Sequence, residues 1–149
     1  MKIAYLHGLE SSIDSSSLKI IWLNDNFSHV YTPSINYHNT NSFTNILTQI
    51  KKHKPDYIVG SSMGGYFAYL IGASLEIPTI LFNPAVIGRS FDPIVDDITL
   101  KETSHSVFLG KTDEVINGAH VQSYFSHFGI GEFTYTDYNG GHRVSAEVF

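Results

Sequence analysis

The sequence predicts an α/β protein with a six-stranded, mostly parallel, doubly wound sheet that carries helices on both faces. Short apolar runs of strand length alternate along the whole chain with longer segments of helical periodicity. Each connection between successive strands is also long enough for the right-handed crossover that parallel strands require. A chain of 149 residues with this pattern is expected to form a single domain over residues 1–149.

Six strands are expected, at residues 1–7, 30–33, 57–59, 78–82, 105–109 and 131–138. The first is an uninterrupted apolar run, which is typical of a parallel strand covered on both faces. Turn-forming residues follow the strands, beginning with Gly8, Gly60, Asn83, Gly110 and Asn139. Because the carboxyl ends of parallel strands meet at one edge of a sheet, ligand chemistry is expected in these loops.

Helices are expected at residues 16–26, at 42–53, directly after Gly64, at 92–98 and at 117–128, followed by a brief helical tail. Apolar spacing places a group of side chains on one face of the first helix, which is expected to be buried. They are Leu18, Ile21 and Trp22, with Phe27 as a further candidate. Ser42 is a suitable N-cap for the second helix. Its inward-facing residues are Phe43, Ile46, Leu47 and Ile50. In the helix at 92–98, Asp92 suits the cap and Pro93 the first position.

Composition excludes several classes of function. The formal net charge of −5 gives no support for binding nucleic acid or an anionic membrane. No cysteine is present, so thiolate catalysis, disulfides and cysteine metal sites are excluded. His120 and His127 share a helix face but lack a third ligand nearby, so neither a metal nor a cofactor is expected. The chain opens directly with a strand-like run and has no membrane-length apolar segment, so a cytoplasmic location is expected.

The stretch Gly60-Ser61-Ser62-Met63-Gly64 lies between a short apolar strand and an apolar helix. In that setting the pattern G-x-S-x-G indicates a nucleophile elbow, a tight turn that exposes the central serine. Ser62 is therefore the candidate nucleophile, with a strained backbone that small neighbours permit. The five-residue pattern by itself is weak evidence for a nucleophile elbow, because a chain with 12 glycines can contain it by chance.

A serine nucleophile needs a base, and the base needs an acid that orients it. His142 follows the last strand in a glycine-rich loop and is the best candidate base, whereas the other histidines read as surface or structural residues. Asp113 follows the penultimate strand and is the candidate acid, with Glu114 expected to point away. The order Ser, Asp, His along the chain is that of the α/β-hydrolases.

The remaining parts of such a site are assigned by position. Attack on a carbonyl creates an oxyanion, which the backbone N–H groups of Met63 and Leu9 are expected to stabilise. Gly8 allows close approach of the backbone to substrate, and His7, which is expected to shape the same loop, is assigned with it to substrate binding.

Residues 85–104 are too few for a large lid. The substrate is therefore expected to be a small ester in an open site, with Ile87 and Phe91 among its apolar walls.

The leading hypothesis is a serine hydrolase that cleaves small carboxylic esters or thioesters and acts as a monomer or homodimer. Two alternatives stay open. The first is a protein that keeps the fold and binds a ligand without catalysis, because a fold does not imply an activity. The second is a hydrolase of amide or C–C bonds that uses the same three residues.

The chain resembles the YqiA-like branch of the α/β-hydrolases, small bacterial esterase-like proteins. The similar blocks are residues 5–12, 59–66, 82–86, 112–115 and 140–143. The resemblance implies a minimal α/β-hydrolase fold without a large lid, ester or thioester hydrolysis, and the roles of nucleophile, acid and base for Ser62, Asp113 and His142. The chain is shorter than is usual for this branch, and Ile87-Gly88 replaces charged residues that often occur there.

Overall fold

The computed structural model describes residues 1–9 and 11–149; Glu10, in the loop expected after the first strand, lies outside the described residues. A six-stranded sheet has the order β2-β1-β3-β4-β5-β6, and every pair of neighbours is parallel. Its strands are β1 (Lys2–Leu6), β2 (His29–Tyr31), β3 (Tyr57–Ser61), β4 (Thr79–Phe82), β5 (Ser104–Gly110) and β6 (Glu132–Tyr138). The helices are α1 (Leu18–Asn26), α2 (Ser42–His53), α3 (Met63–Leu75) and α4 (Gly118–Phe128). The predicted parallel α/β fold is confirmed.

The strand order reverses at β1. From β1 the chain moves outward to β2, then returns to the other side of β1 to form β3, and adds β4, β5 and β6 in sequence. Loops that leave β1 and β3 therefore diverge to opposite faces of the sheet. Such a switch point opens a crevice at the carboxyl ends of the strands, where ligands of α/β sheets bind.

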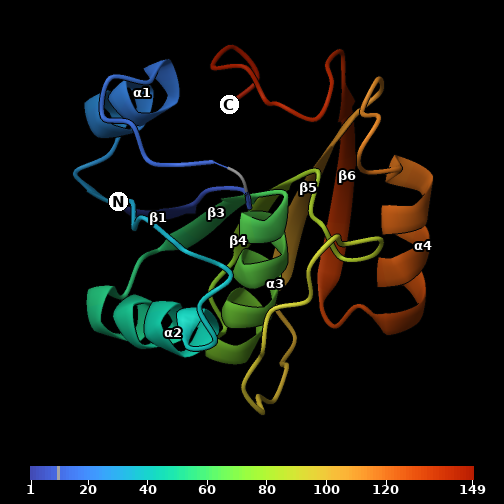
Figure 1. Ribbon diagram of the computed structural model, residues 1–149, viewed down its shortest axis with the longest axis horizontal. Helices are drawn as coiled ribbons and strands as arrows, with labels where there is room; N and C mark the ends of the chain where they lie inside the picture. Colours follow the sequence, from blue (N-terminus) through green and yellow to red (C-terminus); the bar gives the residue numbers. More distant parts are fainter. Residues whose placement is uncertain (10) are drawn as a thin grey trace.

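Helices cover the two faces unequally. On one face α2, α3 and α4 lie side by side (Figure 1), and their side chains form one apolar cluster around Phe43, Phe67 and Phe125. The other face is covered by α1 and the C-terminal segment, through Leu23, Val144 and their neighbours. No described helix is long and apolar enough to cross a membrane.

Helix α3 is almost entirely buried, and a glycine at its start sets how close it lies to the sheet. A Cβ atom at Gly64 would lie 2.0 Å from the carbonyl oxygen of Leu6, so any other residue would push the helix away from β1. The helix ends at Glu76, whose backbone is left-handed with φ of 59°. This close contact fixes the turn between β3 and α3 at the crevice.

The predicted buried face of α1 was wrong. Leu18, Ile21 and Trp22 are 71%, 42% and 40% exposed, and the helix instead buries Ile20 and Leu23. Apolar residues surround this helix on several sides, so their spacing alone did not select a face. Packing against β1 decided it, because Ile20 and Leu23 share an apolar cluster with the first strand.

The helix predicted at 92–98 is absent, and residues 83–103 contain no helix or strand. Asp92 accepts a hydrogen bond from Arg89 at 2.7 Å instead of capping a helix. The segment runs over α2 and α3 and forms a hydrogen bond with each helix. Asp96 accepts a hydrogen bond from the Thr44 hydroxyl of α2, and the Lys101 N–H donates to the Ala73 carbonyl of α3 at 3.0 Å. An irregular segment therefore replaces a crossover helix between β4 and β5.

Two helix ends also differ from prediction. Asn41, not Ser42, occupies the N-cap of α2, and the Ser42 hydroxyl is buried without a hydrogen-bond partner among the described residues. After His142 the chain forms turns rather than a helical tail, since the remaining residues instead pack Val144 and Phe149 onto the sheet. The inward residues predicted for α2 are all buried, as expected.

His105 of β5 links three strands and is only 1% exposed. Its Nδ1 atom lies 2.7 Å from the Thr79 hydroxyl of β4, its Nε2 atom lies 3.2 Å from the Ile130 carbonyl, and its ring stacks on Phe133 of β6. The ring is neutral in this arrangement, with Nε2–H donating to the carbonyl. Burial lowers the pKa of His105 to about 4.

This pKa predicts how stability depends on pH. Below the ordinary histidine pKa of about 6.5, His105 is protonated in the unfolded chain but stays neutral in the folded protein until the pH approaches 4. The free energy of unfolding therefore falls as the pH falls. Between pH ~7 and ~4.5 this residue is expected to account for about 2–3 kcal/mol of lost stability. Urea denaturation of wild type and His105→Gln at both pH values measures it. Equal pH dependence in the two proteins would contradict the prediction.

Candidate active site

An open cavity of about 570 Å³ lies at the carboxyl edge of the sheet. Gly8 and Leu9 line it from the loop after β1, Ser62 from the turn after β3, and His142 from the loop after β6. Val115 and Ser90 line it from the loops after β5 and β4. The crevice predicted at the switch point therefore exists, and loops from five strands contribute to it.

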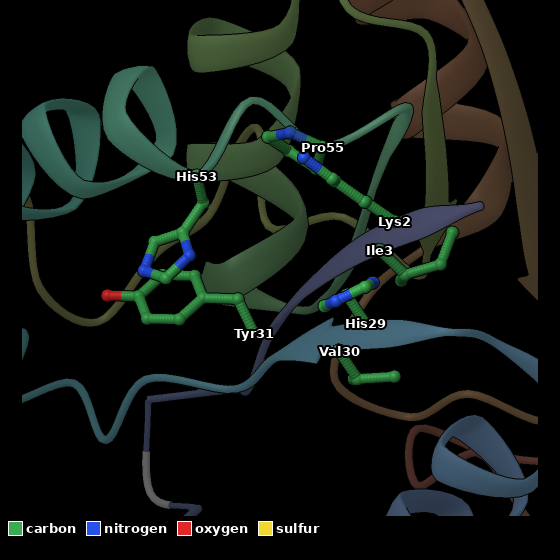
Figure 2. A pocket seen from close by; sticks show the side chains of 7 residues that line it. All are labelled: Lys2, Ile3, His29, Val30, Tyr31, His53 and Pro55. Carbon is green, nitrogen blue, oxygen red and sulfur yellow. The ribbon is translucent and has the colours of Figure 1, made fainter.

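A smaller cavity of about 250 Å³ lies at the opposite edge of the sheet, near the beginnings of β1 and β2 (Figure 2). His53 stacks on Tyr31 there with ring centroids 4.0 Å apart, and Lys2 and His29 lie beside them. No serine or carboxylate is among the described residues that line this cavity. The larger cavity is therefore the candidate active site.

Ser62 occupies a strained turn. Its backbone has φ of 54° and ψ of −117°, a combination that costs about 1–3 kcal/mol in a residue with a side chain. Three hydrogen bonds hold the turn: the Ser62 N–H donates to the Phe82 carbonyl at 3.0 Å, and the Ser62 carbonyl accepts from Tyr66 and Ala85. The surrounding structure thus over-determines a conformation that faces the serine side chain into the cavity.

Asp113 and His142 form a hydrogen-bonded pair. The Nδ1 atom of His142 lies 2.9 Å from Oδ2 of Asp113, while Oδ1 accepts the N–H groups of Val115 and Ile116, each at 2.8 Å. The Asp113 side chain is 1% exposed and that of His142 is 25% exposed. With Nδ1 donating to the carboxylate, Nε2 is the nitrogen of the neutral ring that can accept a proton.

Ser62 and His142 share the cavity without a direct bond. Among the described residues, no hydrogen bond joins the Ser62 hydroxyl to the His142 ring, although both line the same space. Catalytic hydrogen bonds are often long before substrate binds and tighten in the complex. The structure thus brings two of the three predicted residues into contact and places the third across the same cavity.

The two predicted oxyanion donors belong to the start of α3 and to the loop after β1. Met63 is the first residue of α3, where helical N–H groups have no partner within the helix. Leu9 lines the cavity from the loop after β1. A Cβ atom at Gly8 would lie 3.4 Å from the Cβ of Ser62, which brings this loop directly against the elbow. Their roles as donors stay predictions.

His7 has a structural environment. It is 2% exposed, its Nε2 atom accepts the Ile35 N–H at 2.8 Å, and Nδ1 lies 2.7 Å from the Gly8 carbonyl. Its carbonyl accepts the Tyr37 hydroxyl. Burial lowers the pKa of His7, which favours this neutral ring. His7 therefore fixes the loop after β1 and is absent from the described residues that line the cavity.

The two predicted apolar walls lie elsewhere. Ile87 is 37% exposed, and Phe91 contacts the His38 ring with centroids 4.5 Å apart. Neither is among the described residues that line the cavity, so their contact with substrate stays a prediction. Lys19 and Arg143 do line the cavity, a role that no local motif in the sequence indicates. Their place there follows from the packing of α1 and the C-terminal segment on the same face of the sheet.

Sequence reasoning also missed the role of Asn83. This residue is 1% exposed with φ of 43°; its Oδ1 atom accepts the Gly110 N–H at 2.7 Å, and its Nδ2 atom donates to the Tyr138 hydroxyl at 2.6 Å. The Tyr138 hydroxyl in turn donates to the Gly141 carbonyl at 2.9 Å. Asn83 therefore joins the strand ends that carry the Asp113 and His142 loops. An asparagine directly after a buried strand was the available signal.

The described residues contain no group of three or more histidine, cysteine, aspartate or glutamate side chains placed to hold a metal ion. His120 and His127 are exposed on α4.

A family model confirms the suspected relationship. The model of Uncharacterised protein family UPF0227 matches residues 2–122, which is most of the chain. The chain belongs to this family. The residues matched to UPF0227 include Ser62, Asn83 and Asp113, whereas His142 lies beyond them. The YqiA-like resemblance inferred from the motifs is thus confirmed.

Solved structures show the fold to be that of the α/β-hydrolases. A protein of Xanthomonas campestris pv. campestris, described as a hydrolase of the alpha/beta superfamily, is 19% identical with a TM-score of 0.68 over 99% of this chain and 91% of its own. Est1E from Butyrivibrio proteoclasticus is 18% identical, with a TM-score of 0.64 over 95% and 79%. The RedJ thioesterase of Streptomyces coelicolor is 9% identical, with a TM-score of 0.69 over 95% and 78%.

Replacing Asn83 with alanine is expected to lower the free energy of unfolding by about 2–4 kcal/mol. The variant leaves the buried N–H of Gly110 and hydroxyl of Tyr138 with one partner fewer, and alanine tolerates positive φ less well. Urea denaturation measures the loss. Exposed Asn139→Ala is the control and should change stability by no more than about 0.5 kcal/mol. Similar stability of the two variants would show that the Asn83 amide is dispensable.

Proposed function

We propose that this chain is a serine hydrolase that cleaves carboxylic esters or thioesters of small acyl groups through an acyl-enzyme intermediate. The observation that carries the proposal is the hydrogen bond of 2.9 Å between Asp113 and His142. His142 lines the same cavity as Ser62, which lies in the strained turn. A nucleophile, a base and an orienting acid are the minimum such chemistry requires.

In the first half of the reaction, Nε2 of His142 takes the proton of the Ser62 hydroxyl as its oxygen attacks the substrate carbonyl carbon. The buried Asp113 carboxylate keeps the ring in the required tautomer and stabilises the imidazolium that forms. The N–H groups of Met63 and Leu9 stabilise the oxyanion of the tetrahedral intermediate. Collapse expels the alcohol or thiol, which takes the proton from His142, and leaves Ser62 acylated.

In the second half, water replaces the departed alcohol or thiol. His142 takes a proton from this water as it attacks the acyl carbon, and a second tetrahedral intermediate forms at the same oxyanion donors. Collapse returns the proton to the Ser62 oxygen and releases the carboxylic acid. The free hydroxyl and neutral His142 are restored, so no cofactor is consumed.

Two further observations support small substrates. The cavity is open and its volume is about 570 Å³. The irregular segment at residues 83–103, where larger hydrolases often insert a lid, runs over α2 and α3, and of its residues only Ser90 is among the described residues that line the cavity. One similar structure is named a thioesterase, which is consistent with ester or thioester cleavage.

Ser62→Ala, Asp113→Asn and His142→Gln are each expected to lower kcat for 4-nitrophenyl acetate by about a thousandfold or more. Each change removes one member of a unit that acts together in forming the acyl-enzyme. Release of 4-nitrophenolate measures the rate. The exposed α4 residues supply matched controls, Ser123→Ala and His120→Gln, which should retain wild-type turnover. Unchanged turnover in Ser62→Ala would refute the proposal.

Covalent labelling separates catalysis from simple binding. A fluorophosphonate probe should modify Ser62 in the wild-type protein, because the base makes the hydroxyl nucleophilic. Mass spectrometry of the labelled peptide locates the adduct. A folded protein that binds esters but shows no adduct at Ser62 would instead be a ligand-binding member of the fold. Parallel assays with an amide substrate decide between ester and amide cleavage.

A further inference from the structure

Two cationic side chains line the cavity together with Ser62 and His142. Lys19 reaches it from the first turn of α1, and Arg143 directly follows His142. Lys19 is half-buried, and its ammonium lies 6.0 Å from the centre of the Phe149 ring. Lys19 and Arg143 are far apart in the sequence, so they come together only in the folded chain.

The two charges lack an anionic partner in the described part of the chain. Neither Lys19 nor Arg143 forms an ion pair there, and no carboxylate is among the described residues that line the cavity. The Asp113 carboxylate is buried and already accepts three hydrogen bonds. Burial lowers the pKa of Lys19, and the nearby Arg143 guanidinium lowers it further. An anion bound between them would offset this repulsion.

The positive charge of Lys19 and Arg143 is opposite in sign to the net charge of the whole chain. The chain has a formal net charge of −5, so its average surface field repels anions. Two cations that no described carboxylate neutralises, in the lining of the cavity that also holds Ser62, therefore form a local exception. Guanidinium and ammonium groups together are well suited to hold a carboxylate, through charge-assisted hydrogen bonds.

We propose that Lys19 and Arg143 form a subsite for a carboxylate carried by the leaving group of the ester, a specificity that rests on the proposed hydrolase function. The leaving oxygen must lie beside His142, which protonates it. Arg143 follows that histidine and lines the same cavity. The preferred substrate is thus an ester or thioester whose alcohol or thiol portion carries a carboxylate.

Matched esters test this selectivity. One is 4-(butyryloxy)benzoate, whose leaving group is anionic, and the other is its neutral methyl ester, methyl 4-(butyryloxy)benzoate. The ratio of their kcat/KM values is expected to fall about five- to tenfold in Lys19→Met and in Arg143→Gln relative to wild type. Lys52→Gln, an exposed residue of α2, should leave both rates unchanged. In wild type, about 1 M NaCl should reduce the ratio because salt screens partly exposed charges.

A second ester pair distinguishes the two ends of the substrate. Mono-4-nitrophenyl adipate and 4-nitrophenyl hexanoate differ by a carboxylate at the far end of the acyl chain. Their relative rates should change little in Lys19→Met and Arg143→Gln. A loss of selectivity in this pair, with none in the benzoate pair, would overturn the assignment to the leaving group. Unchanged ratios in both pairs would overturn the subsite altogether.

Binding to the inactive protein separates this inference from the proposed function. Calorimetric titration of 4-hydroxybenzoate into Ser62→Ala should give a Kd that weakens about five- to tenfold when Lys19→Met is added. Thermal melting confirms that the variants are folded. Turnover that survives Ser62→Ala would refute the hydrolase, whereas Ser62-dependent turnover with an unchanged Kd in the double variant would refute only the subsite.

Discussion

The tight contact between the start of α3 and the end of β1 constrains the rest of the molecule. Without a side chain at Gly64, the first turn of the helix rests against the Leu6 carbonyl. The chain leaves β3 and enters α3 through a turn with positive φ at Ser62. The same approach brings the Gly8 loop against the serine, because both loops leave neighbouring parallel strands. A packing constraint therefore creates the geometry that the proposed chemistry uses.

A second constraint keeps the other two strand-end loops in place. Asp113 and His142 are 29 residues apart in the sequence, and each belongs to a loop with little regular structure. The buried Asn83 amide satisfies groups at the ends of β5 and β6 at once, so the two loops share one rigid anchor. Its own backbone donates to the Phe108 carbonyl at 2.9 Å. Fully satisfied buried polar groups of this kind specify one arrangement, since any alternative leaves donors unpaired.

The unequal covering of the two faces explains why the cavity is open and why cations reach it. Residues 83–103 cross the face that carries α2 and α3 as an irregular segment and contribute Ser90 to the wall of the cavity at the carboxyl edge of the sheet. On the other face, α1 and the C-terminal segment lie together against β1. That packing brings Lys19 and Arg143 to one side of the cavity, where no described carboxylate neutralises them.

Local patterns in the sequence determined the strands, most of the helices, the turn at Ser62 and the loops that hold Asp113 and His142. These were predictable because strand and helix periodicity act over a few residues, and parallel strands necessarily bring their carboxyl ends to one edge. Only the tertiary structure decided which face α1 buries, that residues 92–98 form no helix, that Asn83 joins the ends of β5 and β6, and that Lys19 and Arg143 line the cavity. Each of these depends on contacts between distant segments, where the same side chain suits several local structures and packing selects one.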